Sequence, residues 1–408
     1  MNTRVRILAA VFGGALVLRL VVLGMVLPKL NPDVDLDYYR SLACSLASGD
    51  GFVATAPNGQ RLPNVARTPV YPLFLAGLIS AAGDRLPNFL VAQCILGAVT
   101  CALTALMASR WLSWDKAVWA GALVAVDPNS VVRCADLRTE TFFTLLLIAG
   151  TCALAWGGER AWLWLLAGLL WSSAALCRPI AVGLWGVVLI VVLRTATSFR
   201  RALFFGLFLA GFVPGIALWA ARNAAVTGHW FVSTISTENL LTSWVTSIRA
   251  EQRGVNLQTV QAELTDDIWN IEFFQDRTHW QQAVGRAHRL FRETISSAPA
   301  VAAKHVAAGW IKLLLGPGAR SLENSLREPK TPPKWWPPFY SAALLVVTVL
   351  AVLAVVKCRK TVLLPALLAL YFVALAGGPV SYSRYRVPIT PVLAILAVAG
   401  TPSWRKNA

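Results

Sequence analysis

The sequence predicts an all-α protein that crosses a membrane many times, and its composition is the first reason. Of its 408 residues, 56% are hydrophobic and only 14% are charged, whereas soluble domains carry about 25% charged residues. The apolar residues form continuous runs, which indicate membrane helices and not a membrane β-barrel. Tryptophans also gather near the ends of these runs, as they do in the interfacial belts of membrane proteins.

Ten apolar runs come close to the roughly 20 residues that a helix needs to cross a bilayer. They are Val5–Leu27, Phe89–Leu112, Ala117–Val132, Thr139–Trp156, Trp162–Cys177, Ile180–Leu193, Ala202–Ala221, Tyr340–Val356, Val362–Pro379 and Pro388–Gly400. The segment Ala298–Leu315 is an alternative eleventh span, although its basic residues favour an amphipathic helix at the membrane surface. The sequence therefore predicts a bundle of about 10–11 membrane helices.

The distribution of basic residues sets the topology. With the N-terminus in the cytoplasm, every short loop on that side is basic, and the two long loops fall on the other side. The basic residues of the short loops and the tail are Arg110, Lys116, Arg160, Arg194, Arg200, Arg201, Lys357, Arg359, Lys360, Arg405 and Lys406. The net charge of +17 thus reflects topology and anionic lipid rather than nucleic acid, for which the sequence has no recognisable module.

Three parts follow from this topology. Residues 1–222 form an N-terminal membrane module, which includes an outer loop at 29–88. Residues 223–338 form a second outer loop with amphipathic helices, and residues 339–408 form the C-terminal membrane helices. We expect both termini in the cytoplasm and the protein in a bacterial inner membrane.

The first outer loop is predicted to hold two helices that do not cross the membrane. Along Asp35–Ser48, apolar residues recur at helical spacing with polar residues opposite, which is typical of a helix lying on a membrane surface. Gly49 and Gly51 would end this helix. Residues 71–82 are apolar but too few to span, so we expect a second interfacial helix there.

Three carboxylates, Asp33, Asp35 and Asp37, alternate directly behind the first span. Acidic groups at the edge of a membrane are costly, and they therefore suggest functional positions. One interpretation is a general base, because a hydroxyl nucleophile needs a carboxylate within hydrogen-bond reach. The other is that Asp35 caps the following helix and that its neighbours are solvated charges.

Three arginines, Arg67, Arg222 and Arg384, fall on the outer side, where the topology gives little reason for basic residues. A guanidinium matches phosphate oxygens bidentately, so converging arginines would bind an anionic headgroup and stabilise its departure. The alternative is that each side chain extends separately to lipid headgroups. Weaker instances of the same pattern are Arg133, Arg138 and Arg178.

Glu140 lies near the outer end of a predicted span, where a carboxylate needs a partner. A structural ion pair is one interpretation, and a second active-site acid is the other. Arg138 would pair with either Glu140 or Asp136. The four histidines and seven cysteines show no metal-ligand spacing, so no metal site is predicted.

Four motifs in order along the chain resemble the GT-C glycosyltransferases, in particular the branch with protein O-mannosyltransferases and bacterial aminoarabinose transferases. An Asp-x-x-x-Tyr motif follows the first span at Asp35 and Tyr39, and Gly-x-Gly-Phe follows at 49–52. A basic residue then precedes Pro-x-Tyr-Pro. The residues of the later motifs are Arg67, Pro69, Tyr71 and Pro72; Pro214, Trp219, Arg222 and Asn223; and Arg384, Tyr385, Pro388 and Pro391.

This resemblance implies a membrane transferase that moves a sugar from a polyprenyl-phosphate donor to an acceptor hydroxyl on the extracytoplasmic face, with inversion. It implies that Asp35 is the general base and that Arg67 and Arg222 hold the donor phosphate, with Arg384 beside them. Leu36 stands where the family usually has Glu, so Asp37 is an alternative base. Supporting residues would be Tyr39, Tyr71, Glu140, Asn223 and Tyr385.

The expected scheme requires no cofactor and no metal, although it is compatible with a divalent ion. The expected partners are the lipid-linked donor, a lipid, glycan or protein acceptor, and membrane lipids. Two other classes stay open. A transporter or flippase of lipid-linked sugars would have charges near mid-membrane and internal repeats. An O-antigen ligase or polymerase would not need the acidic motif behind the first span.

Overall fold

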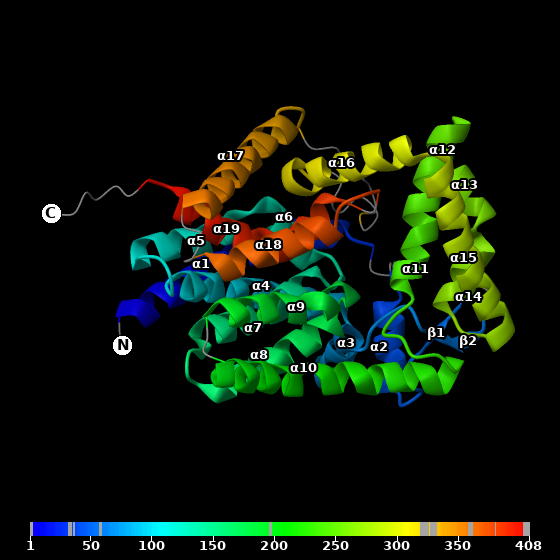
Figure 1. Ribbon diagram of the computed structural model, residues 1–408, viewed down its shortest axis with the longest axis horizontal. Helices are drawn as coiled ribbons and strands as arrows, with labels where there is room; N and C mark the ends of the chain where they lie inside the picture. Colours follow the sequence, from blue (N-terminus) through cyan, green and yellow to red (C-terminus); the bar gives the residue numbers. More distant parts are fainter. Residues whose placement is uncertain are drawn as a thin grey trace.

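The computed structural model describes residues 3–402 except 32–34, 36, 57–58, 196–197, 319–325, 327–332, 358–361 and 380. Asp33 and Leu36 therefore lie outside the described residues, as do Arg359, Lys360, Arg405 and Lys406. Figure 1 shows a bundle of helices whose axes run in broadly the same direction, with a second group of helices across one end. The chain enters the bundle at the opposite end, where α1 begins.

Each of the ten predicted spans contains a helix. The helices are α1 (Thr3–Val26), α4 (Leu86–Ala108), α5 (Trp114–Val126), α7 (Glu140–Gly157), α8 (Ala161–Ala175), α9 (Trp185–Thr195), α10 (Ser198–Thr227), α17 (Trp336–Lys357), α18 (Leu363–Leu375) and α19 (Thr390–Gly400). Within the described residues, five of them are long and apolar enough to cross a membrane: α1, α4, α7, α10 and α17. The all-α class is confirmed, and the count of about ten crossings stays a prediction.

One predicted span is shorter than the sequence indicated. The run Ala117–Val132 breaks at Asp127, because Pro128 has no backbone N–H to continue α5. The Asp127 side chain accepts a hydrogen bond of 2.8 Å from the backbone N–H of Ser130 and so caps the short helix α6 (Pro128–Val132). The buried guanidinium of Arg19 meets the last carbonyls of α5, with Nη1 3.2 Å from the oxygen of Ala125.

The membrane helices pack through glycines as well as through bulky side chains. Between α8 and α10, a Cβ atom added at Gly211 would lie 2.4 Å from the carbonyl oxygen of Leu165, and one at Gly168 would lie 2.1 Å from that of Phe208. Only glycine permits so close an approach of two backbones, as is usual between membrane helices. The observed approach of α8 to α10 therefore requires glycine at these two positions.

The first outer loop contains the two predicted helices and a hairpin that the sequence did not predict. The helices are α2 (Tyr39–Ala47) and α3 (Val70–Ala82), and the hairpin pairs β1 (Val53–Thr55) with β2 (Arg61–Pro63). Phe52 and Ala54 bury against Leu42 of α2 and Phe273 of the second outer loop. The hairpin thus packs its apolar side chains on residues that are far away in the sequence. A two-stranded hairpin is only marginally stable without such packing.

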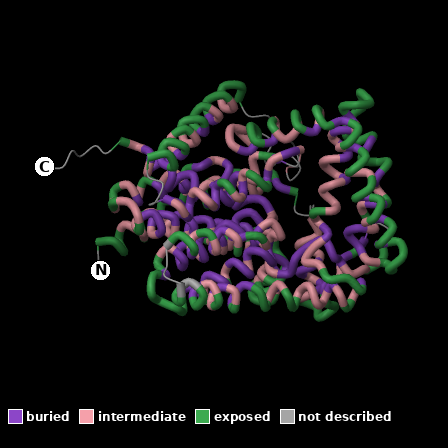
Figure 2. The backbone as a smooth tube through the Cα atoms, viewed as in Figure 1, coloured by how far each residue is buried: buried purple, intermediate pink, exposed green. Residues whose placement is uncertain are grey.

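The second outer loop forms a helical unit across the end of the bundle (Figure 1). Its helices are α11 (Ile235–Asn239), the π-helix η4 (Leu240–Val245), α12 (Thr246–Arg253), α13 (Leu257–Glu263), α14 (Thr265–Glu272), α15 (Arg277–Ser297) and α16 (Pro299–Leu315). Buried side chains, among them Leu241, Ile271 and Ala287, form a separate core within the unit. Figure 2 shows that much of the backbone of α15 and α17 belongs to exposed residues, whereas buried residues gather towards the inside of the bundle.

Backbone hydrogen bonds join the two outer loops. The N–H of Val65 donates to the carbonyl of Glu272 at 3.0 Å, and the N–H of Phe274 donates to the carbonyl of Pro63 at 3.0 Å. On the other side of the same segment, the N–H of Thr234 donates to the carbonyl of Val65 at 3.2 Å. Residues 63–65 are thus held between two segments of the second loop. This arrangement also positions Arg67, which follows two residues later.

We predict that Gly211→Leu lowers the apparent melting temperature of the purified protein in detergent. The added side chain must displace the backbone of α8, and overpacking of this kind costs about 1–3 kcal/mol or more. Gly206→Leu, on the same helix with nothing within 4 Å, is the matched control and should melt as the wild type does. Equal melting temperatures for the two variants would contradict the close packing described for α8 and α10.

Candidate functional site

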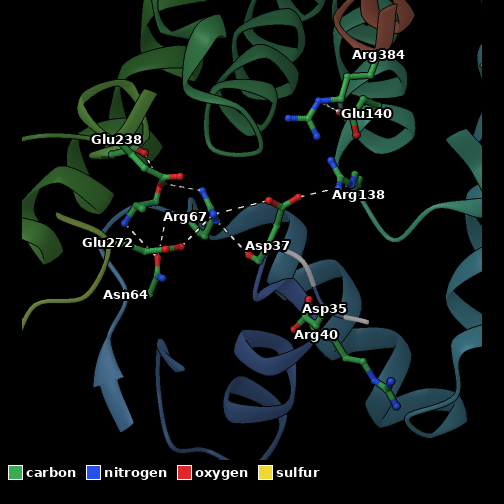
Figure 3. Close-up of polar contacts among 12 residues, drawn as sticks. Asp35, Asp37, Arg40, Asn64, Arg67, Arg138, Glu140, Glu238, Glu272 and Arg384 are labelled. Carbon is green, nitrogen blue, oxygen red and sulfur yellow. Dashed lines mark hydrogen bonds and ion pairs between the residues drawn. The ribbon is translucent and has the colours of Figure 1, made fainter. Parts of the chain in front are cut away.

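Arg67 is the centre of a group of charges between the two outer loops (Figure 3). Its Nη2 lies 3.0 Å from Oε1 of Glu272, and its Nη1 lies 3.4 Å from Oε2 of Glu238. Nη2 is also 3.8 Å from Oδ1 of Asp37, and Nε donates to the backbone carbonyl of Asp37 at 3.1 Å. One buried guanidinium therefore faces three carboxylates from three separate segments.

The local sequence places Arg67. The side-chain oxygen of Asn64 accepts hydrogen bonds from the backbone N–H groups of Ala66 (3.1 Å) and Arg67 (2.8 Å), which forms an Asx-type turn. This turn directs the chain from β2 into α3. Asn64 is itself fully buried, because residues 63–65 lie between two segments of the second loop.

The carboxylates outnumber the arginine, and this affects how they ionise. Burial is the largest cause that raises the pKa of Glu238 and of Glu272 above the usual carboxyl range. The charge of Arg67 lowers both pKa values in part, and the Asp37 charge raises them further. Neither glutamate is recognisable from the sequence, because both lie in mixed, polar stretches of the second loop.

Asp35 and Asp37 have different surroundings, although they are two residues apart. The oxygens of Asp35 accept hydrogen bonds from the backbone N–H groups of Arg40 (3.2 Å) and Ser41 (2.8 Å) in the first turn of α2. Burial is the main cause that raises the pKa of Asp35. The predicted helix cap is therefore present at Asp35, whereas the carboxylate of Asp37 lies among the charges (Figure 3).

From Asp37, further charged side chains continue towards the start of α7. Nε of Arg138 lies 3.8 Å from Oδ2 of Asp37 and 3.3 Å from Oδ2 of Asp136. Arg133 also pairs with Asp136, whose pKa burial raises to about 6. Of the two partners that the sequence allowed for Arg138, the structure shows Asp136.

Glu140 pairs with two arginines. Its Oε1 lies 2.9 Å from Nη1 of Arg178 and 3.9 Å from Nε of Arg384, which belongs to the 3₁₀ helix η6 (Ser383–Ile389). Both guanidinium groups lie over the ring of Tyr385, at 5.2 and 5.0 Å from its centroid, and Arg384 donates to the Tyr385 hydroxyl at 3.1 Å. Here arginines outnumber carboxylates, the reverse of the Arg67 group.

The remaining predicted residues hold the loops in place. Arg222 donates to the backbone carbonyls of Asn64 (3.1 Å) and Phe52 (3.2 Å), and the amide of Asn223 donates to the carbonyls of Phe231 and Val232. The rings of Tyr39 and Tyr71 pack edge to face, with centroids 5.0 Å apart. In the described part of the chain, no group of three or more His, Cys, Asp or Glu residues is arranged to hold a metal ion.

No protein-family model matches the chain, and no curated protein is similar to it. Solved structures do match. The apo oligosaccharyltransferase of Archaeoglobus fulgidus gives a TM-score of 0.56 at 10% identity over 97% of this chain and 50% of that one. Its complex with an inhibitory peptide and a dolichol-phosphate gives 0.57 at 13% identity over the same shares. ArnT from Cupriavidus metallidurans bound to undecaprenyl phosphate gives 0.44 at 15% identity over 96% and 76%.

The matches to the archaeal enzyme show that this chain has a similar, GT-C-like fold, as the sequence led us to expect. The chain spans about half the length of that oligosaccharyltransferase. Because the identities are low, the activity of this chain has to be inferred from its own charged site.

We predict that Glu238→Gln makes folding stability less dependent on pH. A carboxyl whose pKa is raised by folding binds more protons in the folded state than in the unfolded state, so wild-type stability falls as the pH rises through the usual carboxyl range towards the raised value. In melting curves recorded at several pH values, the melting temperature of the variant should decrease less with rising pH than that of the wild type. Glu293→Gln, at an exposed position of α15, should retain the wild-type profile, and identical profiles for both variants would refute the prediction.

Proposed function

We propose that the chain is a membrane glycosyltransferase that moves a sugar from a polyprenyl-phosphate donor to an acceptor hydroxyl on the extracytoplasmic side. The observation that carries this proposal is the separation of charge within one site. Carboxylates are in excess around Arg67, and arginines are in excess around Glu140, with Asp37 and Arg138 between the two groups. Such a site can accept a proton at one side and hold a phosphate at the other.

The separation of charge matches the needs of the proposed reaction. The acceptor oxygen attacks the anomeric carbon, the bond from that carbon to the phosphate oxygen breaks, and the polyprenyl phosphate leaves with the bonding electrons. A carboxylate takes the hydroxyl proton. The phosphate is a weak base, so its departure needs no second acid, and a single displacement inverts the anomeric centre.

We assign the general base to Asp37 rather than to Asp35. Asp35 accepts hydrogen bonds from two backbone N–H groups of α2, so its removal would disturb the helix. The Asp37 carboxylate is 28% exposed and lies between Arg67 and Arg138. A base needs such access to its substrate together with neighbours that fix its position.

We assign the donor phosphate to Arg178 and Arg384, which pair with Glu140, and to Arg138, which lies between the two groups. Their side chains are 14–25% exposed, whereas that of Arg67 is 8% exposed and faces three carboxylates. Arg67 would bind a phosphate directly only after a glutamate withdrew or took up a proton. We therefore assign Arg67 to the positioning of Asp37, and Arg222 to the positioning of the first outer loop.

The predicted topology sets the side of the membrane on which the proposed reaction takes place. The site lies at the end of the bundle away from the start of α1 (Figure 1), so a cytoplasmic N-terminus puts the reaction on the extracytoplasmic side of a bacterial inner membrane. The oligosaccharyltransferase that has a similar fold was solved in complex with a dolichol-phosphate. This complex supports a lipid-phosphate donor for the present chain. The scheme calls for no cofactor and no metal ion.

We predict that Asp37→Asn lowers kcat for sugar transfer by about 10²–10⁴-fold, the usual contribution of a general base. The measurement is transfer of radiolabelled sugar from a polyprenyl-phosphate donor in membranes with matched protein levels. Asp35→Asn keeps a side-chain oxygen for the α2 N–H groups and should retain most of the activity. Loss of transfer in Asp35→Asn, with Asp37→Asn active, would move the base to Asp35.

We predict that Arg384→Ala reduces kcat/KM for the donor by one to several orders of magnitude, because charge-assisted bonds to the leaving phosphate strengthen as the donor bond breaks. Inhibition by sugar-free polyprenyl phosphate should weaken in the same variant. Arg289→Ala, at an exposed position of α15, is the control and should match the wild type. Unchanged donor kinetics in Arg384→Ala would exclude this arginine from the phosphate site.

A further inference from the structure

A groove lies in the bundle outside the charged site. It encloses about 310 Å³ between α5, α17, α19 and η6. Its lining is mainly apolar and includes Leu123, Leu344, Val347 and Leu393. Two residues of the lining, Val126 (60% exposed) and Phe339 (65% exposed), belong to the outer surface of the bundle, so the groove opens laterally between α5 and α17.

One end of the groove is polar. The Tyr340 hydroxyl donates to Oδ1 of Asp127, and Nη2 of Arg386 lies 3.4 Å from the same hydroxyl. Nη1 of Arg386 donates to the carbonyls of Leu313 and Gly316, each at 2.9 Å. Arg386 is 1% exposed, and none of the described residues accepts a hydrogen bond from its Nε. A buried N–H without an acceptor is a position at which an oxygen from a bound molecule can complete the hydrogen bonding.

The polar and apolar parts of the groove are arranged as the headgroup and the acyl chain are in a membrane lipid. Asp127 follows the last residue of α5 and Tyr340 lies in the first turns of α17, so both belong to the end of the bundle that carries the outer loops. Leu344 and Val347 continue along α17 towards its middle. Since α17 is apolar and long enough to cross a membrane, we expect bilayer lipids next to the opening.

We propose that the groove binds one acyl chain of a bilayer phospholipid, with an oxygen at the head end of the chain completing the hydrogen bonds of Arg386. Hydrocarbon would fill an apolar space that water does not fill well, and it would gain dispersion contacts with the lining. The charges of Asp127 and Arg386 balance each other through Tyr340, so the polar end suits a neutral ester oxygen. A phosphate would instead favour the arginine excess near Glu140.

The groove and the charged site share η6. Arg384 and Tyr385 of this helix contact the Glu140 group, whereas Arg386 belongs to the polar end of the groove. Asn129, two residues after Asp127, donates to the carbonyl of Ser383 at 2.6 Å. A bound lipid would therefore support η6 and hold Arg384 in place. This last step rests on the proposed function, but the lipid site itself does not.

The test uses the full chain in lipid nanodiscs with a phospholipid that carries a photoactivatable group in its acyl chain. Labelled peptides are mapped by mass spectrometry. We expect wild-type labels at groove-lining residues of α17 and α19. Ala343→Trp, at an exposed position that lines the groove, should reduce this labelling several-fold by filling the space. Ala342→Trp, the neighbouring exposed residue outside the lining, is the matched control and should be labelled as the wild type.

Two results would overturn the proposal. One is the absence of labels from the groove lining in the wild type, which does not depend on how any variant folds. The other is selective labelling of the same residues by a polyprenyl phosphate with the same photoactivatable group, which would assign the groove to the donor chain. Because labelling needs no sugar transfer, its outcome is distinguishable from a failure of the proposed activity.

Discussion

The arrangement of the outer face depends on the buried guanidinium of Arg67. It faces carboxylates from the segment before α2, from α11 and from α14, which are far apart in the sequence. Removing Arg67 would leave three partly or fully buried carboxylates without their shared cation, and such a loss typically costs several kcal/mol. The two outer loops are therefore held together by electrostatics as well as by the backbone hydrogen bonds around residues 63–65.

This arrangement has a consequence for chemistry. A buried site of fixed charges does not reorganise when charge moves during a reaction, and charge placed beforehand is an efficient way to stabilise a transition state. In the proposed reaction, negative charge moves towards the phosphate while a proton moves towards Asp37. The excess of arginines near Glu140 and the excess of carboxylates near Arg67 match these two movements.

The sequence predicts most of the bundle but only part of the site. Hydrophobic runs locate the membrane helices, because each helix must be apolar along its own length. The hydrophobic run from which the span Ala117–Val132 was predicted continues past Asp127, although α5 ends before Pro128. Asp37, Arg138 and Glu140 were identifiable because charge near a span end is unusual. Glu238 and Glu272 were not, since their meeting with Arg67 depends on how the second loop folds across the bundle.

Asp35 shows a second limit of the sequence. The motif behind the first span is compatible with both a helix cap and a base, and spacing alone does not separate these roles. In the structure the Asp35 oxygens accept hydrogen bonds from N–H groups of α2, which is the reason for proposing Asp37 as the base. The hairpin β1–β2 was missed for a related reason, because its apolar face exists only through contact with Phe273.

The most direct test of lipid-linked sugar transfer is an assay of membranes that contain the wild-type chain against a panel of radiolabelled polyprenyl-phosphate sugars. We expect that at least one donor passes its label to an endogenous acceptor and releases polyprenyl phosphate in equal amount. Matched membranes without the chain should do neither. No transfer above that background with any donor, at confirmed expression of the chain, would contradict the assignment as a polyprenyl-phosphate sugar transferase.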